Sequence, residues 1–347
     1  MYPKSLVGRS RIRYNPANNR TIAHPAPAGA TAVQIQHNTA AQNRKPMRTL
    51  LRLLLLSLLF TRDANASEIV VRDDAGRQVV LERAAGRIVS LAPHATELLF
   101  AAGAGSRVVG VVGNSDYPVG ARALPVVGSA ASLNLEAIIA LQPDLVVAWK
   151  SGNNGAALER LVQLGVAVFY SEPRRLEDVA SNLQRLGTLA GTAATAQSAA
   201  RQFLEDYRQL AREYADRATV RTFYQIWAQP LITVNGQHLI SQVIALCGGR
   251  NIFAGLDALA PVVNREAVLV ADPQIIIAGG KPGEQARQLD SWRAWTQLSA
   301  VKNRQLYLID PDLIQRQGPR ILEGARIMCR QIEKARSAAR EDADIRR

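Results

Sequence analysis

An internal repeat constrains the fold of this chain more than any other feature of its sequence. The segments "NLEAIIALQPDLVVAWKSG" and "NREAVLVADPQIIIAGGKPG" match at a constant offset of 130 residues. Each contains a short apolar helix, a proline that stops the helix because its ring cannot continue the hydrogen-bond ladder, and an apolar strand. A repeated helix–proline–strand unit indicates two related lobes. The matched pairs are Asn134 with Asn264, Glu136 with Glu266, Ala137 with Ala267, Pro143 with Pro273 and Ala148 with Ala278.

Apolar strands alternate with helices around both copies of the repeat. The first series runs from "RIVSLA" to "VAVFYS", residues 87–171, and the second from "TFYQIW" to "QLYLID", residues 222–310. The second series includes a helix expected over Trp292–Leu298. Such alternation is typical of a parallel sheet covered on both faces. The predicted fold class is therefore α/β, with two lobes that each hold a central, mostly parallel sheet. Before the first series, "EIVVRDDAGRQVVLE" predicts a hairpin with its turn at residues 74–76.

One long helix is predicted between the two series, because an apolar stripe at helical spacing continues from about Thr195 to Asp216. We expect this backbone helix to join the lobes. A terminal helix is expected from about Pro319 to Ala335, and the charged segment after it is expected to fray. The predicted parts are residues 1–46, a disordered or mis-annotated extension; 47–66, a signal peptide; 67–190, the first lobe; 191–217, the linking helix; 218–335, the second lobe; and 336–347, a charged tail.

The N-terminal segment carries most of the excess positive charge. Ten of the 42 Lys and Arg residues, but one of the 29 Asp and Glu residues, lie within residues 1–66, so the remainder is nearly balanced and predicts no nucleic-acid partner. "MRTLLRLLLLSLLFTRDANAS" has basic residues, a short apolar run and a small-x-small site, which is the layout of a secretory signal peptide cleaved after Ala66. A buried helix is the alternative. We expect export to the periplasm of a Gram-negative cell without a lipid anchor, since no cysteine lies near the cleavage site.

Motifs for catalysis are missing from the sequence. There is no G-x-S-x-G, H-E-x-x-H, P-loop or dinucleotide fingerprint, and the exported part has only His94 and His238 as histidines. The two cysteines, Cys247 and Cys329, are too few for a zinc or iron–sulfur ligand set. They are either a disulfide or two buried thiols. We therefore expect neither an enzyme nor a metal site.

Several segments together resemble a known family. They are "RIVSLAPHATELLFAAGA", "NSDYP", "LNLEAIIALQPDLVVAW", "LITVNGQHLISQVIALCGGRNIF", "NREAVLVADPQIIIAGG" and "DPDLIQRQGPRILEGARIMC". Between about Arg87 and Glu333 the chain resembles the periplasmic vitamin B12-binding proteins of ABC importers. Their wider class of solute-binding proteins, with lobes joined by one rigid helix, also includes haem and ferric-siderophore binders, which are the alternative.

The resemblance implies a function and partners. A monomer would capture a corrinoid, expected to be cobalamin, between its lobes, and would deliver it to an inner-membrane ABC permease and its ATPase. It needs no cofactor of its own. The resemblance also implies a Cys247–Cys329 disulfide, and docking of Glu136 and Glu266 into arginine pockets of the permease. The alternative for the two glutamates is simple stabilisation of the helix dipole.

The same resemblance implies a ligand cleft. Trp149 matches a cleft tryptophan, and Asp312 with Arg316 matches a polar pair at the ligand edge; the alternatives are a core residue and a surface ion pair. Tyr117 and Trp227 are expected to compensate for aromatic residues that some relatives have at three other positions. Those positions hold Asn114, Ala130 and Ala260.

His94 follows the first strand at the cleft edge. Three roles are open for it: a structural role at the start of the helix, contact with the ligand, or axial ligation of haem iron.

Overall fold

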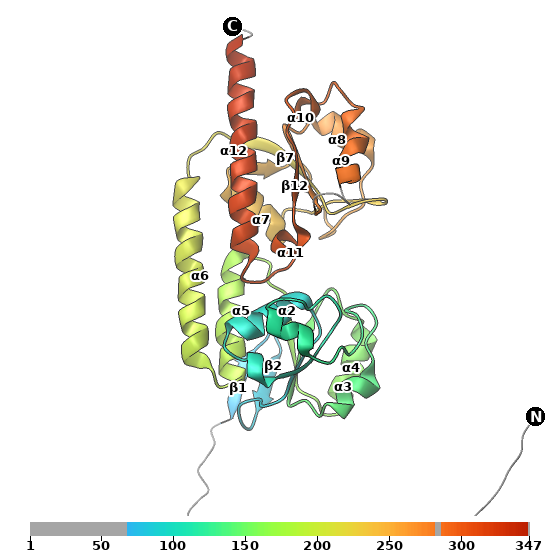
Figure 1. Cartoon of the computed structure of the whole chain (residues 1–347), viewed down its shortest axis with the longest axis vertical. Helices are drawn as coiled ribbons and strands as arrows, with labels where there is room; N and C mark the ends of the chain where they lie inside the picture. The colour runs from blue at the N-terminus through green and yellow to red at the C-terminus, as the bar shows by residue number, and fades with distance from the viewer. Residues whose placement is uncertain (1–67, 282–285, 346–347) are drawn as a thin grey trace, which may run out of the picture. The chain divides into compact units, whose positions relative to one another are not determined.

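The computed structural model describes residues 68–281 and 286–345, and these belong to one compact unit, residues 65–347 (Figure 1). The predicted extension and signal peptide therefore lie outside the described residues. Within them, no helix is both long enough and apolar enough to cross a membrane.

The described chain begins with the predicted hairpin. Strands β1 (Ile69–Arg72) and β2 (Gln78–Leu81) pair in antiparallel fashion. Asp73 shapes the turn, since its Oδ1 accepts the backbone N–H groups of Ala75 at 2.9 Å and Arg77 at 2.8 Å. A side chain that replaces backbone partners in this way is typical of an Asx turn.

The first lobe is built on a four-stranded parallel sheet. Its central strand β5 buries alternate residues in two different cores, with Leu145 and Val147 on one face and Val146 and Ala148 on the other. This explains why the strand is a continuous apolar run. In sheet order the strands are β4 (Val108–Val111), β3 (Ile88–Ser90), β5 (Leu145–Trp149) and β6 (Val168–Ser171). The helices are α2 (Pro93–Ala101), α3 (Leu135–Ala140), α4 (Gly155–Gln163) and α5 (Leu176–Leu189), with short 3₁₀ turns η1 (Gly105–Arg107) and η2 (Val119–Ala123).

Helix α6 (Ala193–Glu213) connects the two sheets along the chain and packs beside α5 (Figure 1). The two helices approach closely at Gly187, where an added Cβ would lie 2.1 Å from the Cβ of Ala196. The predicted linking helix is therefore present, displaced by two to three residues toward the N-terminus from the expected Thr195–Asp216. The exact division into lobes at residues 190 and 218 stays a prediction.

The second lobe repeats the parallel sheet, so the predicted fold class is confirmed. The strand order is β10 (Gly249–Asn251), β7 (Val220–Gln225), β11 (Ile275–Gly279) and β12 (Leu306–Ile309). A small antiparallel pair, β8 (Trp227–Ala228) and β9 (Leu231–Ile232), follows β7. The helices are α7 (Leu239–Leu246), α8 (Arg265–Ala271), α9 (Ala286–Arg293), α10 (Ser299–Lys302), α11 (Pro311–Ile314) and α12 (Ile321–Ile345).

Two local expectations in this lobe are wrong. The helix predicted over Trp292–Leu298 is instead the end of α9, a turn, and the residue that precedes α10. The terminal helix does not end near Ala335, because α12 continues through the charged segment to Ile345.

The internal repeat is visible in the geometry of both copies. The Oδ1 atoms of Asn134 and Asn264 each accept the backbone N–H three residues later at 2.9 Å, which caps α3 and α8. Each helix is followed by a residue with positive φ, Gln142 at 46° and Asp272 at 39°, and then by the proline. The two copies therefore have the same local structure, including the asparagine cap and the proline that follows the helix.

A disulfide joins Cys247, at the end of α7, to Cys329 in α12, with their Cα atoms 4.6 Å apart. This pairing confirms the disulfide implied by the resemblance. Both residues are fully buried. The two cysteines are 82 residues apart in the sequence. In the loop-entropy model, a crosslink over that length raises the free energy of the unfolded chain by about 4.5 kcal/mol and so stabilises the fold.

Candidate functional site

The tryptophan at the end of β5 is held by the turn that follows it. Its backbone N–H donates to Asn153 Oδ1 at 2.7 Å, and the Asn153 amide donates to the carbonyls of Leu91 at 2.9 Å and Ala130 at 2.7 Å. Gly152 lies directly against the Trp149 ring, since an added Cβ there would be 1.9 Å from a ring carbon. The sequence WKSGN thus fixes the indole at the carboxyl edge of the sheet, where α/β proteins bind ligands.

Two adjoining cavities share Trp149 and Gln315 as a common wall. The first, about 480 Å³, we call the apolar cavity, and the second, about 330 Å³, the polar cavity. Both are lined by residues of both lobes, so together they form an inter-lobe cleft. The apolar cavity is also lined by Ser151, Ile226, Ile232, His238, Ile240, Leu259, Ala260 and Gln317. The polar cavity is also lined by Pro93, His94, Asn114, Asp116, Lys281, Pro311, Asp312 and Arg316.

His94 lies at this cleft, packed edge-on against Trp149 with ring centroids 5.6 Å apart. It is 4% exposed, and burial lowers its pKa to about 4 against weaker opposing effects of Asp74 and the Ser171 backbone. The imidazole is therefore neutral at physiological pH. Ala92 occupies the N-cap of α2, so the side chain of His94 does not cap that helix.

Three buried polar atoms in the cavity walls have no hydrogen-bond partner within the described part of the chain. They are His94 Nε2, Trp149 Nε1 and Gln317 Oε1. Buried polar groups are usually satisfied, so these three atoms, which are almost inaccessible to solvent, are exceptions in the walls of the cavities. His238 differs, because its Nδ1 accepts the N–H of Ile240 at 3.1 Å and caps α7; burial lowers its pKa to about 4.

Arg316 is the centre of the polar wall. Its side chain is 11% exposed, and its guanidinium bonds Asp312 of its own lobe at 2.8 Å and, across the cleft, Asp116 at 2.8 Å and Glu97 at 3.1 Å. Burial alone would lower the pKa of Arg316, but these carboxylates raise it above its usual value. The Asp312–Arg316 pair is thus part of a partly buried contact between the lobes and not an isolated surface pair, while its contact with a ligand stays a prediction.

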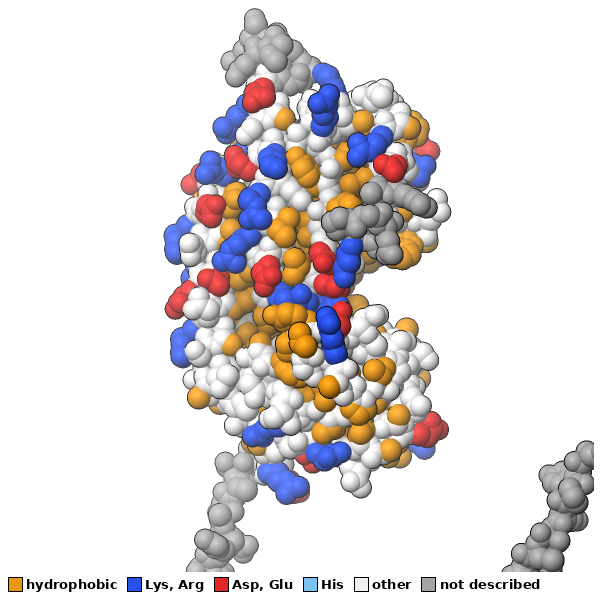
Figure 2. All heavy atoms as spheres, in the orientation of Figure 1, with side chains coloured by type: hydrophobic (Ala, Val, Ile, Leu, Met, Phe, Trp, Pro, Cys, Tyr) orange, Lys and Arg blue, Asp and Glu red, His pale blue; other side chains and the backbone are white. Residues whose placement is uncertain are grey.

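Further charged side chains extend this contact. Lys281 Nζ lies 2.8 Å from Asp312 and 4.0 Å from Asp310, and Arg320 donates to Glu97 at 2.9 and 2.5 Å. In Figure 2, acidic and basic side chains gather where the lobes meet. We call the connected set the inter-lobe ion cluster: Glu97, Asp116, Lys281, Asp310, Asp312, Arg316 and Arg320.

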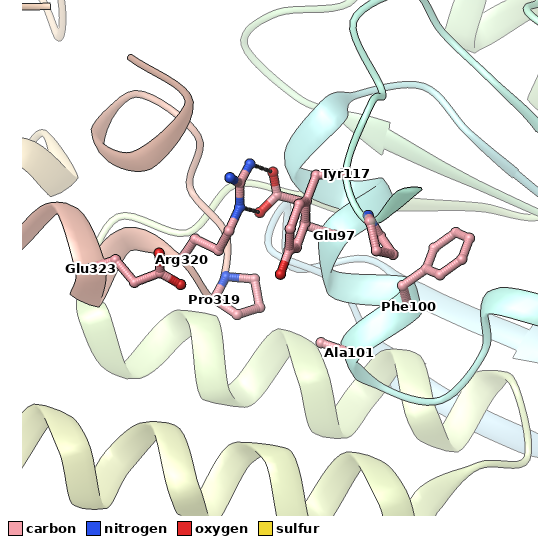
Figure 3. Close-up of a pocket in the computed structure, with 8 residues that line it drawn as sticks. Glu97, Phe100, Ala101, Tyr117, Pro319, Arg320 and Glu323 are labelled. Carbon is pink, nitrogen blue, oxygen red and sulfur yellow. Dashed lines mark hydrogen bonds and ion pairs between the residues drawn. The ribbon is translucent and has the colours of Figure 1, made fainter. Parts of the chain in front are cut away.

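The structure does not bring the two remaining predicted aromatics into the cavities. Tyr117 lines a separate pocket of about 380 Å³, with the Arg320 guanidinium 3.9 Å from its ring centroid (Figure 3). Trp227 is 54% exposed on β8, and its indole N–H donates to the Gln229 carbonyl at 3.0 Å. Of the positions expected to have lost aromatics, Asn114 and Ala260 line the cavities.

Glu136 and Glu266 lie away from these cavities on α3 and α8. Both are exposed in the first turn of their helix, directly after the asparagine cap. Neither forms an ion pair within residues 68–281 and 286–345. No group of three or more His, Cys, Asp or Glu residues in the described chain could hold a metal ion.

Comparison with known proteins identifies the family. Residues 88–313 match the model of the family described as periplasmic binding protein. The chain belongs to the periplasmic binding protein family. Members of this family are solute-binding proteins and not enzymes.

Two periplasmic binding proteins with similar sequences carry the name vitamin B12-binding protein. That of Vibrio parahaemolyticus is 38% identical over 251 residues, 72% of this chain and 90% of its own length. That of Yersinia pestis is 39% identical over 246 residues, 71% of this chain and 85% of its own length.

Solved structures of periplasmic binding proteins have a similar fold. The periplasmic vitamin B12 binding protein BtuF of Vibrio cholerae has a TM-score of 0.68 and 38% identity, with 72% of this chain and 98% of that chain covered. The periplasmic heme-binding protein RhuT of Roseiflexus has a TM-score of 0.63 and 24% identity, over 72% of this chain and 98% of that chain. At that identity the second likeness concerns the fold alone.

Proposed function

We propose that this protein is a periplasmic solute-binding protein that captures a corrinoid, expected to be cobalamin, between its lobes and delivers it to an ABC importer. One observation carries the proposal: Trp149 separates an apolar cavity from a polar cavity whose cations are paired with carboxylates. The names of the relatives at 38 and 39% identity support the same ligand class.

The cleft suits the chemistry of a corrinoid. A corrin ring is flat and broad, so it packs on an indole and on the isoleucines of the apolar cavity. Its amide arms are uncharged and supply both donors and acceptors. Those arms match the carboxylates around Arg316, which accept hydrogen bonds from an amide N–H.

Haem and ferric siderophores are the second candidate, and the ion cluster argues against them. The propionates of haem are anionic and need cations that are free to pair with them. Arg316 is already bonded to three carboxylates, and the cluster contains four carboxylates against three cations. His94 is 4% exposed and packs edge-on against Trp149, which leaves little room for axial ligation of an iron.

Delivery requires a membrane partner, which we propose is an inner-membrane permease with its ATPase. The exposed Glu136 and Glu266 support this, because one acid on each repeat-related helix can pair with one arginine on each half of a two-fold permease. Export by the signal peptide at residues 47–66 would bring the mature monomer to the periplasm. The nearly balanced charge after residue 66 gives no support for a nucleic-acid partner.

Titration of the mature chain, Ser67–Arg347, with cyanocobalamin and with hemin tests the proposal. We expect saturable cyanocobalamin binding, read by quenching of tryptophan fluorescence and by calorimetry, and no shift of the hemin Soret band. Hemin binding without cyanocobalamin binding would replace the proposal with the second candidate.

A further inference from the structure

Glu97 is buried at the junction of the lobes. It lies on α2 of the first lobe with its side chain 2% exposed, yet its bonding partners belong to the second lobe. Arg316 donates to Oε1 at 3.1 Å, and Arg320 donates to Oε2 at 2.9 Å and to Oε1 at 2.5 Å. A buried carboxylate with two guanidinium partners is charge-compensated.

The two arginines face different cavities. Arg316 lines the polar cavity beside Trp149, whereas Arg320 lines the pocket of Tyr117, where Figure 3 shows its two contacts with Glu97. Glu97 therefore connects the wall of the ligand cleft to the opposite side of the junction. Because the carboxylate is held from both sides, the guanidinium of Arg316 is fixed in place.

The pairing also decides what Arg316 can offer a ligand. Its Nη1 donates to Glu97 and Asp116, and its Nη2 lies 2.8 Å from Asp312. A guanidinium surrounded by three carboxylates has little electrostatic attraction left for an anion. The same carboxylates accept hydrogen bonds from an amide N–H, so an uncharged amide arm is the favoured neighbour.

From these contacts we infer that Glu97 is a specificity-determining residue: by neutralising Arg316 from the opposite lobe, it makes the cleft prefer amide-bearing ligands over their carboxylate counterparts. Glu97 lines neither half of the cleft and acts through Arg316, so it is a positioning residue. The inference rests on the proposed function, because it assumes that a corrinoid arm reaches Arg316.

The ligands for the test are cyanocobalamin and its three monocarboxylic acids, in each of which one amide arm is hydrolysed to a carboxylate. The mature wild-type protein should bind at least one of the acids about tenfold more weakly than cyanocobalamin, the size expected from one charge-assisted contact. Glu97→Gln should reduce that preference by about tenfold, because Arg316 gains attraction for the carboxylate. If Glu97 had a purely structural role, the variant would bind all four ligands more weakly by the same factor. The ratio of the affinity for cyanocobalamin to the affinity for each acid would then be unchanged.

Two further variants keep the test decisive. Asp116→Asn removes a half-exposed carboxylate, 2.8 Å from Arg316, without disturbing the buried core, and should shift the ratio in the same direction even if Glu97→Gln does not fold. Glu323→Gln is the matched control, since Glu323 lines the Tyr117 pocket, is exposed and has no ion pair in the described chain. Its ratio should equal that of the wild type.

The outcomes separate the two claims. If the wild type binds cyanocobalamin and neither Glu97→Gln nor Asp116→Asn changes the ratio, the role of Glu97 is refuted while the proposed function stands. If the wild type binds no corrinoid, the proposed function fails and this inference fails with it.

Discussion

Gly152 offers a direct way to displace the cleft tryptophan without replacing it. The variant Gly152→Ala would add a Cβ at 1.9 to 2.3 Å from three ring carbons of Trp149. Carbon atoms in contact are normally about 3.5–4.0 Å apart, so the indole must retreat by roughly 1.5 Å or more. Gly152 does not have positive φ, so the backbone itself accepts alanine and the strain falls on the ring.

The expected magnitudes follow from that displacement. Overpacking of this kind lowers the free energy of unfolding by about 1–3 kcal/mol. Loss of an aromatic face for the ligand costs about 1 kcal/mol of binding free energy, so cyanocobalamin should bind roughly fivefold more weakly. Urea denaturation measures the first quantity, and a fluorescence or calorimetric titration measures the second.

The chain contains a matched control three residues further on. An added Cβ at Gly155, at the start of α4, meets no atom within 4 Å, so Gly155→Ala should leave stability and affinity close to wild type. If Gly152→Ala binds cyanocobalamin as tightly as Gly155→Ala does, the position of the indole does not matter for binding. Trp149 would then be an ordinary core residue.

Three further predictions concern pH, the disulfide and delivery. The pKa of His94 is about 4 in the folded protein and about 6.5 when unfolded, so the unfolded state binds more protons between these values, and His94 alone should lower stability by about 3 kcal/mol as pH drops from 6.5 to 4. The pKa of His238 is lowered in the same way, so His94→Gln should remove one share of the slope in denaturation at several pH values and leave the share of His238. Replacing Cys247 and Cys329 with Ala should lower the free energy of unfolding by about 2–5 kcal/mol, and an unchanged urea midpoint would contradict a stabilising disulfide. Glu136→Ala combined with Glu266→Ala should leave cyanocobalamin affinity intact but reduce uptake in cells, and undiminished uptake would remove the docking role.

The repeat unit shows how much local sequence can predict. Its helix, proline and strand depend on neighbouring residues: an asparagine cap, an apolar run and a proline stop. For that reason β5 and β11 lie where the apolar runs lie. The position of Trp149 at the strand end follows from the same local pattern.

Tertiary contacts explain what the sequence could not predict. Glu97 and Arg316 are 219 residues apart, and no local pattern marks them as partners. Trp292, Trp295 and Leu298 follow one another at intervals of three residues, which resembles the spacing of a helix. They instead form two successive turns, in which Trp295 N–H donates to Trp292 O and Leu298 N–H donates to Trp295 O. Spacing alone does not distinguish consecutive turns from a continuous helix.

The two copies of the repeat have diverged at their strand ends in a way that is difficult to reverse. Where the first copy has Trp149, the second has Gly279, and an added Cβ there would lie 2.2 Å from Gln315 Nε2. That amide donates to the hydroxyl of the buried Tyr224 at 3.2 Å, so the space of the missing side chain is occupied by a residue from another element. Gly279→Trp would therefore not recreate a second indole wall unless Gln315 and Tyr224 changed as well. The two lobes share a repeated framework, but a single substitution does not make their strand ends interchangeable.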